Sequence, residues 1–309
     1  MKLSVSFCGK TFESPTVIPS GVYVAHGAFL EAVNAGVGAV TTKSVSVEKR
    51  LGNPYPRLIP YKNLGYLNSV GLANPGIKEG SSEIAKLVKE SRAPVIASIV
   101  GFKMADFETL VRGVVKANPA MIEVNLSCPN VEAETGAKPW ATDAKMSEEA
   151  IKRVKKYSGK IPVIAKLSPN VANIVTIAKA VVLAGADGIC AINSLGPGLL
   201  IDIGKKKALL GAGSGGVTGP AIFPIALRNV FDIHKNLPDI PIIGMGGVST
   251  WQDVVAMIEV GATLVGIGSS IYMSKKKFGL ITEINEGLIK FMKDNKIKNL
   301  EELRGTYKG

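Results

Sequence analysis

Short apolar runs alternate along the chain with longer stretches in which apolar residues recur every three to four positions. Eight runs rich in Val, Ile and Ala are candidate β-strands, at residues 17–19, 39–43, 95–100, 121–127, 162–168, 188–193, 241–246 and 263–268. The longer stretches predict helices over residues 29–35, 83–91, 107–116, 148–157, 173–183, 221–234, 252–259 and 278–292. Ser147, Asp106 and Pro220 stand at expected helix starts.

This order of elements predicts the fold. Strands that alternate with helices pair in parallel, because each helix carries the chain back across the sheet. A complete set of eight such units favours a closed (β/α)8 TIM barrel over an open sheet. The segment after the second strand, residues 44–80, is rich in Gly, Pro, Asn and Tyr, and we expect it to lie over the barrel mouth. No linker divides the chain, so residues 1–309 are predicted to form one domain.

Composition and charge exclude several classes of protein. With 46% hydrophobic and 20% charged residues the chain is an ordinary globular one. Subtracting 25 acidic from 37 basic residues gives a net charge of +12, which can favour nucleic acid. No aromatic residues interleave with the lysine clusters, so a solvated surface is the better interpretation. No stretch approaches the ~20 apolar residues of a membrane span, and we expect a cytoplasmic protein without a membrane segment.

The candidate chemistry gathers at the predicted carboxyl ends of the strands, where TIM barrels place their active sites. Lys43 ends the second strand, Asn125 the fourth, and Asn193 and Ser194 the sixth, while Lys166 lies in the fifth. Two lysines near one mouth imply a shared anionic ligand, because burying an unpaired ammonium is costly. A structural ion pair between Lys166 and Glu123 is the competing interpretation.

Two glycine-rich loops predict a phosphate site. Gly246 and Gly247 follow the seventh strand, and Gly268 and Ser269 follow the eighth. In this fold these two loops commonly bind phosphate through backbone N–H groups, and glycine lets the backbone approach an anion. Tight turns alone would also explain the glycines, but their pairing at these two strand ends favours phosphate.

The three cysteines differ in their setting. Cys8, Cys128 and Cys190 are widely spaced, and His26 and His234 are the only histidines in the sequence, so neither a metal site nor a disulfide framework is predicted. We expect Cys8 and Cys190 to be small buried apolar residues. Cys128 precedes a proline just beyond the fourth strand, between Asn125 and Asn130. A thiol there can act as a general base beside amides that suit a flat heterocycle.

Several segments together resemble the class 1, soluble form of dihydroorotate dehydrogenase, in one consistent order along nearly the whole chain. They are Thr-Lys-Ser at 42–44, Leu-Asn-Ser-Val-Gly-Leu-Ala-Asn-Pro-Gly at 67–76, Glu-Val-Asn-Leu-Ser-Cys-Pro-Asn at 123–130, Ala-Lys-Leu-Ser-Pro-Asn at 165–170, Gly-Pro-Ala-Ile at 219–222 and Ile-Gly-Met-Gly-Gly at 243–247.

The resemblance implies an FMN-dependent enzyme that oxidises dihydroorotate to orotate in pyrimidine (UMP) biosynthesis, with Cys128 as the base. Implied substrate-binding residues are Lys43, Asn68, Ser69, Val70, Gly71, Leu72, Asn125, Asn130, Asn193 and Ser194. Implied FMN-binding residues are Ser20, Lys43, Ser44, Ser98, Asn125, Lys166, Ile192, Gly219, Gly246, Gly247, Gly268 and Ser269, the last four at its phosphate. Ser98 departs from the family, which usually has Asn there.

The resemblance also suggests partners. A dimeric catalytic core is expected, and the NAD-linked B subclass passes electrons to a separate subunit that carries FAD and an iron–sulfur cluster. The segments at 165–170 and 219–222 favour this subclass, whereas the loop after the sixth strand mixes features of the fumarate-using one. A direct acceptor such as fumarate therefore stays open. A barrel that reduces uridine in tRNA is the alternative function, disfavoured because no RNA-binding segment is evident.

Overall fold

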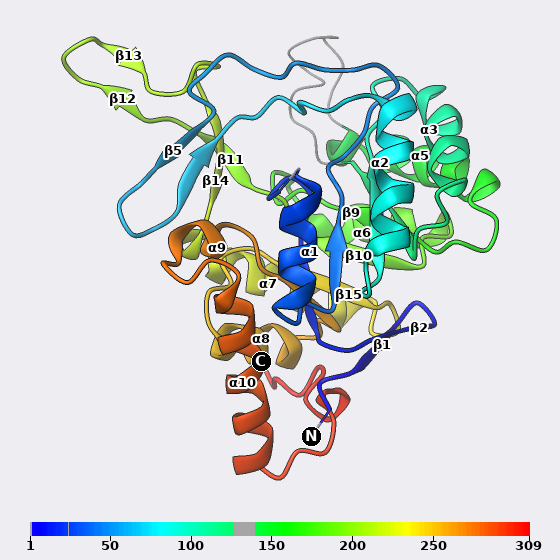
Figure 1. Cartoon of the computed structure of the whole chain (residues 1–309), viewed down its shortest axis with the longest axis vertical. Coiled ribbons are helices and arrows are strands. Elements are labelled where there is room, and N and C mark those ends of the chain that lie inside the picture. The colour runs from blue at the N-terminus through cyan, green and yellow to red at the C-terminus, as the bar shows by residue number, and fades with distance from the viewer. Residues whose placement is uncertain (1, 24, 127–139) are drawn as a thin grey trace.

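The computed structural model describes residues 2–23, 25–126 and 140–309, and they form a closed barrel of parallel strands surrounded by helices (Figure 1). The barrel strands, in spatial and chain order, are β3 (Thr16–Ile18), β4 (Ala39–Thr41), β7 (Val95–Ile99), β8 (Met121–Asn125), β9 (Val163–Lys166), β10 (Gly188–Ala191), β15 (Ile242–Met245) and β16 (Leu264–Gly266). Seven lie within the runs predicted from the apolar pattern, and β3 overlaps its run but begins one residue earlier, at Thr16. The predicted barrel is confirmed.

The barrel strands form the core. Their residues are almost all buried, as expected for parallel strands that are covered on both faces and therefore read as continuous apolar runs. Ile18, Ile96 and Ile164 have no exposed surface, and each such burial contributes roughly 1.5–3 kcal/mol. This packing holds the strand ends, and the polar residues on them, in fixed positions.

Helices cover the barrel from outside. They are α1 (His26–Asn34), α2 (Ile77–Glu90), α3 (Asp106–Val115), α5 (Ala144–Tyr157), α6 (Ile174–Leu183), α7 (Phe223–Asn236), α8 (Trp251–Glu259), α9 (Ser269–Met273) and α10 (Gly279–Asp294), with 3-10 turns at Trp140–Thr142, Pro220–Ile222 and Leu300–Glu302.

The two largest errors in the predicted helix starts concern α5 and α2. Helix α5 begins at Ala144, because Asp143 accepts hydrogen bonds from the backbone N–H groups of Lys145 and Met146. Ser147 lies inside the helix and donates to the carbonyl of Trp140. Helix α2 begins at Ile77, six residues before the predicted start, directly after Gly76 with φ of +84°. The polar residues of its first turns hid this start from the apolar pattern.

An antiparallel sheet caps one end of the barrel. Strands β5 (Leu58–Pro60) and β6 (Tyr66–Asn68) come from the segment after β4, and β11 (Leu195–Gly198) and β14 (Gly215–Thr218) from the segment after β10. Their order is β11-β14-β6-β5, with Gly216 opposite Asn68. This capping sheet and the projecting hairpin of β12 (Ile201–Asp202) and β13 (Lys207–Ala208) lie at the top of Figure 1.

The opposite end of the barrel carries the two ends of the chain. The hairpin of β1 (Val5–Phe7) and β2 (Lys10–Phe12) lies there, and both termini are marked in the lower part of Figure 1. The capping sheet and the termini are therefore separated by the length of the barrel.

Candidate active site at the carboxyl ends of the barrel strands

Five side chains from the ends of four consecutive barrel strands form a hydrogen-bonded cluster. The hydroxyl oxygens of Ser20 and Ser44 lie 3.0 Å apart, and those of Ser44 and Ser98 lie 2.8 Å apart. Ser98 Oγ donates to Glu123 Oε1 over 2.8 Å, and Asn125 Nδ2 donates to Ser44 Oγ over 3.1 Å. The strands β3, β4, β7 and β8 thus place five polar groups in one cluster, which joins four predicted site residues to Glu123.

Two lysines flank this cluster. Lys166 ends β9 and is only 4% exposed, and its side chain makes no ion pair or hydrogen bond with any residue that the structure describes. The predicted alternative, a structural ion pair with Glu123, is therefore not formed. The ammonium of Lys43 lies next to Gly21, where an added Cβ would be 3.5 Å from its Nζ. The buried side chain of Lys166, which has no carboxylate partner among the described residues, suits a site for an anion.

Strand β14 brings two predicted substrate-binding residues together. Asn68 Nδ2 donates to the carbonyl of Gly216 over 3.0 Å. A Cβ on Gly216 would overlap the hydroxyl of Ser194, so glycine at this position lets Ser194 lie against the capping sheet. The backbone N–H of Ser194 in turn donates to Asn193 Oδ1 over 2.8 Å. Residues nearly 150 positions apart thus meet at one edge of the site.

The loop 69–72 is held by an asparagine that the sequence did not point to. Asn53 Nδ2 donates to Ser69 Oγ over 2.7 Å, and the Asn53 backbone N–H donates to the carbonyl of Val70 over 3.1 Å. Gly71 and Leu72 both have positive φ, +73° and +55°. No local pattern links residue 53 to this loop, because the contact arises only when the segment after β4 folds back on itself.

Two further asparagines stand in segments quoted for the family resemblance but had no predicted role. Asn74 is 7% exposed and makes four hydrogen bonds that join Ser46, Leu72 and Gly76. Asn170 Nδ2 donates to the carbonyl of Ser194 over 3.3 Å, and its Oδ1 accepts from the N–H of Gly196 over 2.9 Å. Asn170 therefore joins the loop after β9 to the loop after β10.

The two glycine-rich loops lie side by side, as the phosphate prediction requires. Ser270 Oγ donates to the carbonyl of Val248 over 2.6 Å, which ties the loop after β16 to the loop after β15. Gly246 and Gly247 have φ of +131° and +77°. A Cβ on Gly247 would lie 2.7 Å from the carbonyl of Gly219, so close packing also demands glycine here.

The remaining predicted residues lie near the glycine-rich loops or outside the described part of the chain. Ile192 follows β10 and donates its N–H to the carbonyl of Met245 over 2.9 Å, beside the first glycine-rich loop. Gly268 and Ser269 stand at the start of α9. Cys128 and Asn130 lie outside the described residues.

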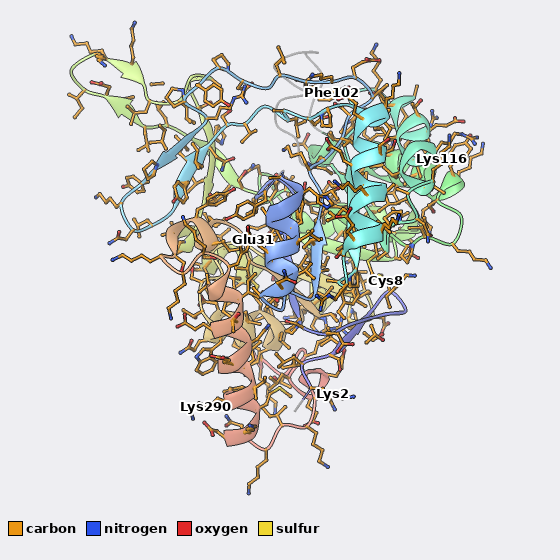
Figure 2. The ribbon with its side chains drawn as sticks, viewed as in Figure 1. Lys2, Cys8, Glu31, Phe102, Lys116 and Lys290 are labelled. Atoms are coloured by element: carbon orange, nitrogen blue, oxygen red, sulfur yellow. The ribbon has the colours of Figure 1, made fainter. Side chains whose placement is uncertain are left out.

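Cys8 lies apart from the polar cluster, whereas Cys190 lies close to Glu123 and Lys166. Cys8 lies at the opposite end of the barrel from Phe102 (Figure 2), and its thiol donates to the carbonyl of Asp187 over 3.2 Å. Burial, followed by the nearby Asp187 carboxylate, raises the pKa of Cys8 to about 12. Cys190 is wholly buried, and burial first and Glu123 second raise its pKa well above the usual value. Both thiols are thus held in the neutral form.

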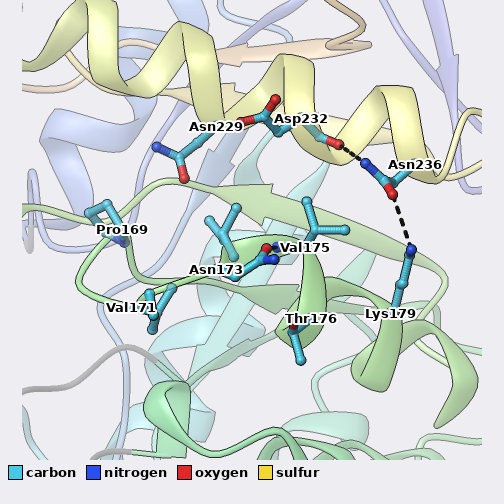
Figure 3. A pocket seen from close by; sticks show the side chains of 11 residues that line it. Pro169, Val171, Asn173, Val175, Thr176, Lys179, Asn229, Asp232 and Asn236 are labelled. Atoms are coloured by element: carbon cyan, nitrogen blue, oxygen red, sulfur yellow. Dashed lines mark hydrogen bonds between the residues drawn. The ribbon is translucent and has the colours of Figure 1, made fainter.

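A separate hollow of about 530 Å³ lies outside the barrel between the start of α6 and helix α7 (Figure 3). Its lining is mostly polar, and Lys179 Nζ there donates to Asn236 Oδ1 over 3.0 Å. None of the predicted site residues is among the described residues that line it. The hollow therefore plays no part in the candidate site.

Neither a membrane-spanning helix nor a metal-binding cluster occurs among the described residues. No helix in that part of the chain is long and apolar enough to cross a membrane. No group of three or more His, Cys, Asp or Glu side chains there is arranged to hold a metal ion.

Comparison with known proteins identifies the family. The family model described as dihydroorotate dehydrogenase matches residues 2–292. The chain is 39% identical over 307 residues to the "dihydroorotate dehydrogenase B (NAD(+)), catalytic subunit" of Alkaliphilus metalliredigens, covering 99% of each chain. It is 38% identical over 309 residues to the protein of the same name from Pyrococcus furiosus, covering 99% of this chain and 98% of that protein.

A solved structure supports the fold. The crystal structure of DHODH from Eimeria tenella in complex with ferulenol superposes with a TM-score of 0.83, covering 98% of this chain and 88% of that one at 19% identity. Since the family model and the relatives span nearly the whole sequence, the chain belongs to the dihydroorotate dehydrogenase family.

Proposed function

We propose that this chain oxidises dihydroorotate to orotate in pyrimidine biosynthesis, with FMN as its cofactor and Cys128 as the general base. The observation that carries the proposal is the polar cluster at the strand ends, flanked by Lys43 and Lys166, in a chain of this family. The family match favours this activity over the uridine-reducing alternative.

The residues present fit FMN. Lys166 offers a buried ammonium without a partner among the described residues, which suits the negative charge of a reduced flavin. Gly246, Gly247, Gly268 and Ser269 stand in two adjoining loops that suit a phosphate. The cofactor set of the sequence analysis, from Ser20 to Ser269, thus remains our proposed FMN site. When bound, FMN supplies the acceptor for a hydride.

The chain's own residues handle the substrate. Asn68, Asn125, Asn130, Asn193 and Ser194, with Lys43 and the backbone of residues 69–72, hold its ring and its carboxylate. Cys128 takes the proton from C5 while the hydride leaves C6. Asparagine amides suit this ring, because its edge alternates N–H donors with carbonyl acceptors.

The partners follow from the same family. The relatives are named as catalytic subunits of an NAD-linked enzyme, which implies a second subunit in those proteins. We propose that this chain likewise passes electrons to a separate subunit with FAD and an iron–sulfur cluster, and that its catalytic core is a homodimer of one-domain chains in the cytoplasm. Direct reduction of fumarate is the competing route.

Anaerobic addition of L-dihydroorotate to the FMN-loaded protein tests the activity. We expect rapid loss of the absorbance of oxidised flavin at about 450 nm. Cys128→Ser should still bind FMN and orotate but reduce flavin about 100-fold more slowly, with its pH dependence moved upward. Unchanged kinetics in Cys128→Ser would remove the base role. A loaded protein that is not bleached, yet binds tRNA, would favour the alternative function.

A further inference from the structure

The buried Glu123 stands at one end of the hydrogen-bonded chain through Ser98 and Ser44. Ser44, Ser98 and Glu123 are at most 1% exposed, and the links between them are each 2.8 Å long. Ser44 is also contacted by Ser20 and by Asn125. A buried carboxylate is costly unless it is hydrogen-bonded, so its presence here calls for an explanation.

The carboxylate sets the direction of every hydrogen bond in the chain. A carboxylate only accepts, and a serine hydroxyl has one proton to give. Ser98 gives its proton to Glu123, so it can only accept from Ser44. Ser44 has then used its own proton and must accept from both Ser20 and Asn125. All the protons therefore point toward Glu123.

This polarity decides how the amide of Asn125 is turned. An asparagine amide can present either end to a neighbour, and here Ser44 accepts only from Nδ2. The Oδ1 atom of Asn125 is thereby directed away from Ser44 as a hydrogen-bond acceptor. Both flavin and dihydroorotate carry ring N–H groups, which need such an acceptor.

We propose that Glu123 is a positioning residue of the site, which acts through Ser98 and Ser44 to present the Asn125 carbonyl oxygen to a ring N–H of the bound ligand. In this arrangement Ser98, which is wholly buried and hydrogen-bonded to both Ser44 and Glu123, takes part in the proposed FMN site through the relay rather than by direct contact with the cofactor. The inference rests on the proposed function, because it takes FMN and dihydroorotate as the ligands.

Glu123→Gln and Ser98→Ala, singly and combined, test this. Glutamine can donate as well as accept, and alanine breaks the relay, so either change removes the constraint that the relay places on the orientation of the Asn125 amide. We expect each to weaken FMN binding to the apoprotein about tenfold and to change the visible circular dichroism of the bound flavin in the same way. Because both act through one relay, the double variant should be no worse than either single one.

Glu286→Gln is the matched control, since it makes the same chemical change on the exposed face of α10. It should leave FMN binding and the flavin spectrum unchanged. Losses of FMN affinity that add up in the double variant would overturn the relay. If Glu123→Gln folds poorly, Ser98→Ala decides alone, and wild-type FMN affinity and flavin spectrum in that variant would overturn the relay.

The binding data separate this inference from the proposed function. A wild-type protein that binds FMN but is not bleached by dihydroorotate would refute the activity, and the FMN affinities would still decide the role of Glu123. A wild-type protein that takes up no FMN would contradict both.

Discussion

At the scale of single residues, the reactivity of a thiol depends on where the fold places it. Cys8 is partly exposed, yet its thiol donates to the carbonyl of Asp187, and its pKa is raised to about 12 by burial and by the Asp187 carboxylate. The nearby Lys155 opposes this shift without cancelling it. Since the thiolate is the reactive form, a partly exposed cysteine here is chemically inert.

We therefore expect Cys8 to resist iodoacetamide in the folded protein at pH 8, where its thiolate fraction is negligible. Buried Cys190 should resist equally. Mass spectrometry of labelled peptides measures this, with the urea-denatured protein as the control in which both cysteines react. Rapid labelling of Cys8 in the native protein would show that its thiol is not held neutral.

At the scale of elements, side-chain amides fasten one loop of the mouth to the next. Asn170 joins the loop after β9 to Ser194 and Gly196 after β10. Three residues later, Asn173 caps α6 by accepting from the N–H of Val175 over 2.9 Å. The two asparagines lie in one segment, but only Asn170 reaches the loop of a predicted substrate-binding residue.

Asn170→Ala should raise KM for dihydroorotate about tenfold, because the loop that carries Ser194 loses two hydrogen bonds. The affinity of this variant for FMN should change little, because the loops proposed to bind the FMN phosphate follow β15 and β16. Asn173→Ala is the matched control and should cost about 1 kcal/mol of stability with KM unchanged. Steady-state kinetics and urea unfolding measure both, and equal KM values in the two variants would refute the role of Asn170.

At the scale of the whole molecule, the candidate site and the C-terminal segment lie at opposite ends of the barrel. The polar cluster lies at the carboxyl ends of the strands, whereas the C-terminal segment packs at the other end (Figure 1). There Arg304 donates to the carbonyls of Gly261, Pro238 and Ile240. The ring of His234 fits against Gly261 and Gly305, where a Cβ would overlap it.

Burial first, and Arg304 second, lower the pKa of His234 below its ordinary value of about 6.5. The folded state therefore binds a proton at His234 less readily than the unfolded state. This contribution to stability is fully present above pH 6.5 and is lost as the pH falls from there through the lowered pKa. The melting temperature of His234→Gln should therefore fall less than that of the wild type between about pH 7.5 and about pH 5, the range in which His234 takes up its proton on unfolding.

Thermal unfolding at several pH values tests the His234 prediction, with turnover at saturating substrate as its control. Turnover should match that of the wild type, because His234 is remote from the strand ends. A variant whose melting temperature falls as steeply with pH as that of the wild type would contradict it.

Local patterns were sufficient for the barrel and for many candidate site residues. A strand that is buried on both faces needs a continuous apolar run, so such runs can be recognised in the sequence. Polar residues that end these runs, such as Lys166 and Asn125, can be recognised in the same way. The family resemblance supplied further candidates, including Asn68 and Ser20, that no apolar period marks.

Only the tertiary structure decided the capping sheet and the contacts that orient the site. Strand β14 is Gly215–Thr218, too short and too poor in apolar side chains to show a period, and its partner β6 lies about 150 residues earlier. Likewise, Ser98 meets Glu123 because β7 and β8 are neighbours in register. Hydrophobic periodicity reports which face of a local segment is buried, whereas the partner of a polar side chain depends on which distant strand the closed barrel sets beside it.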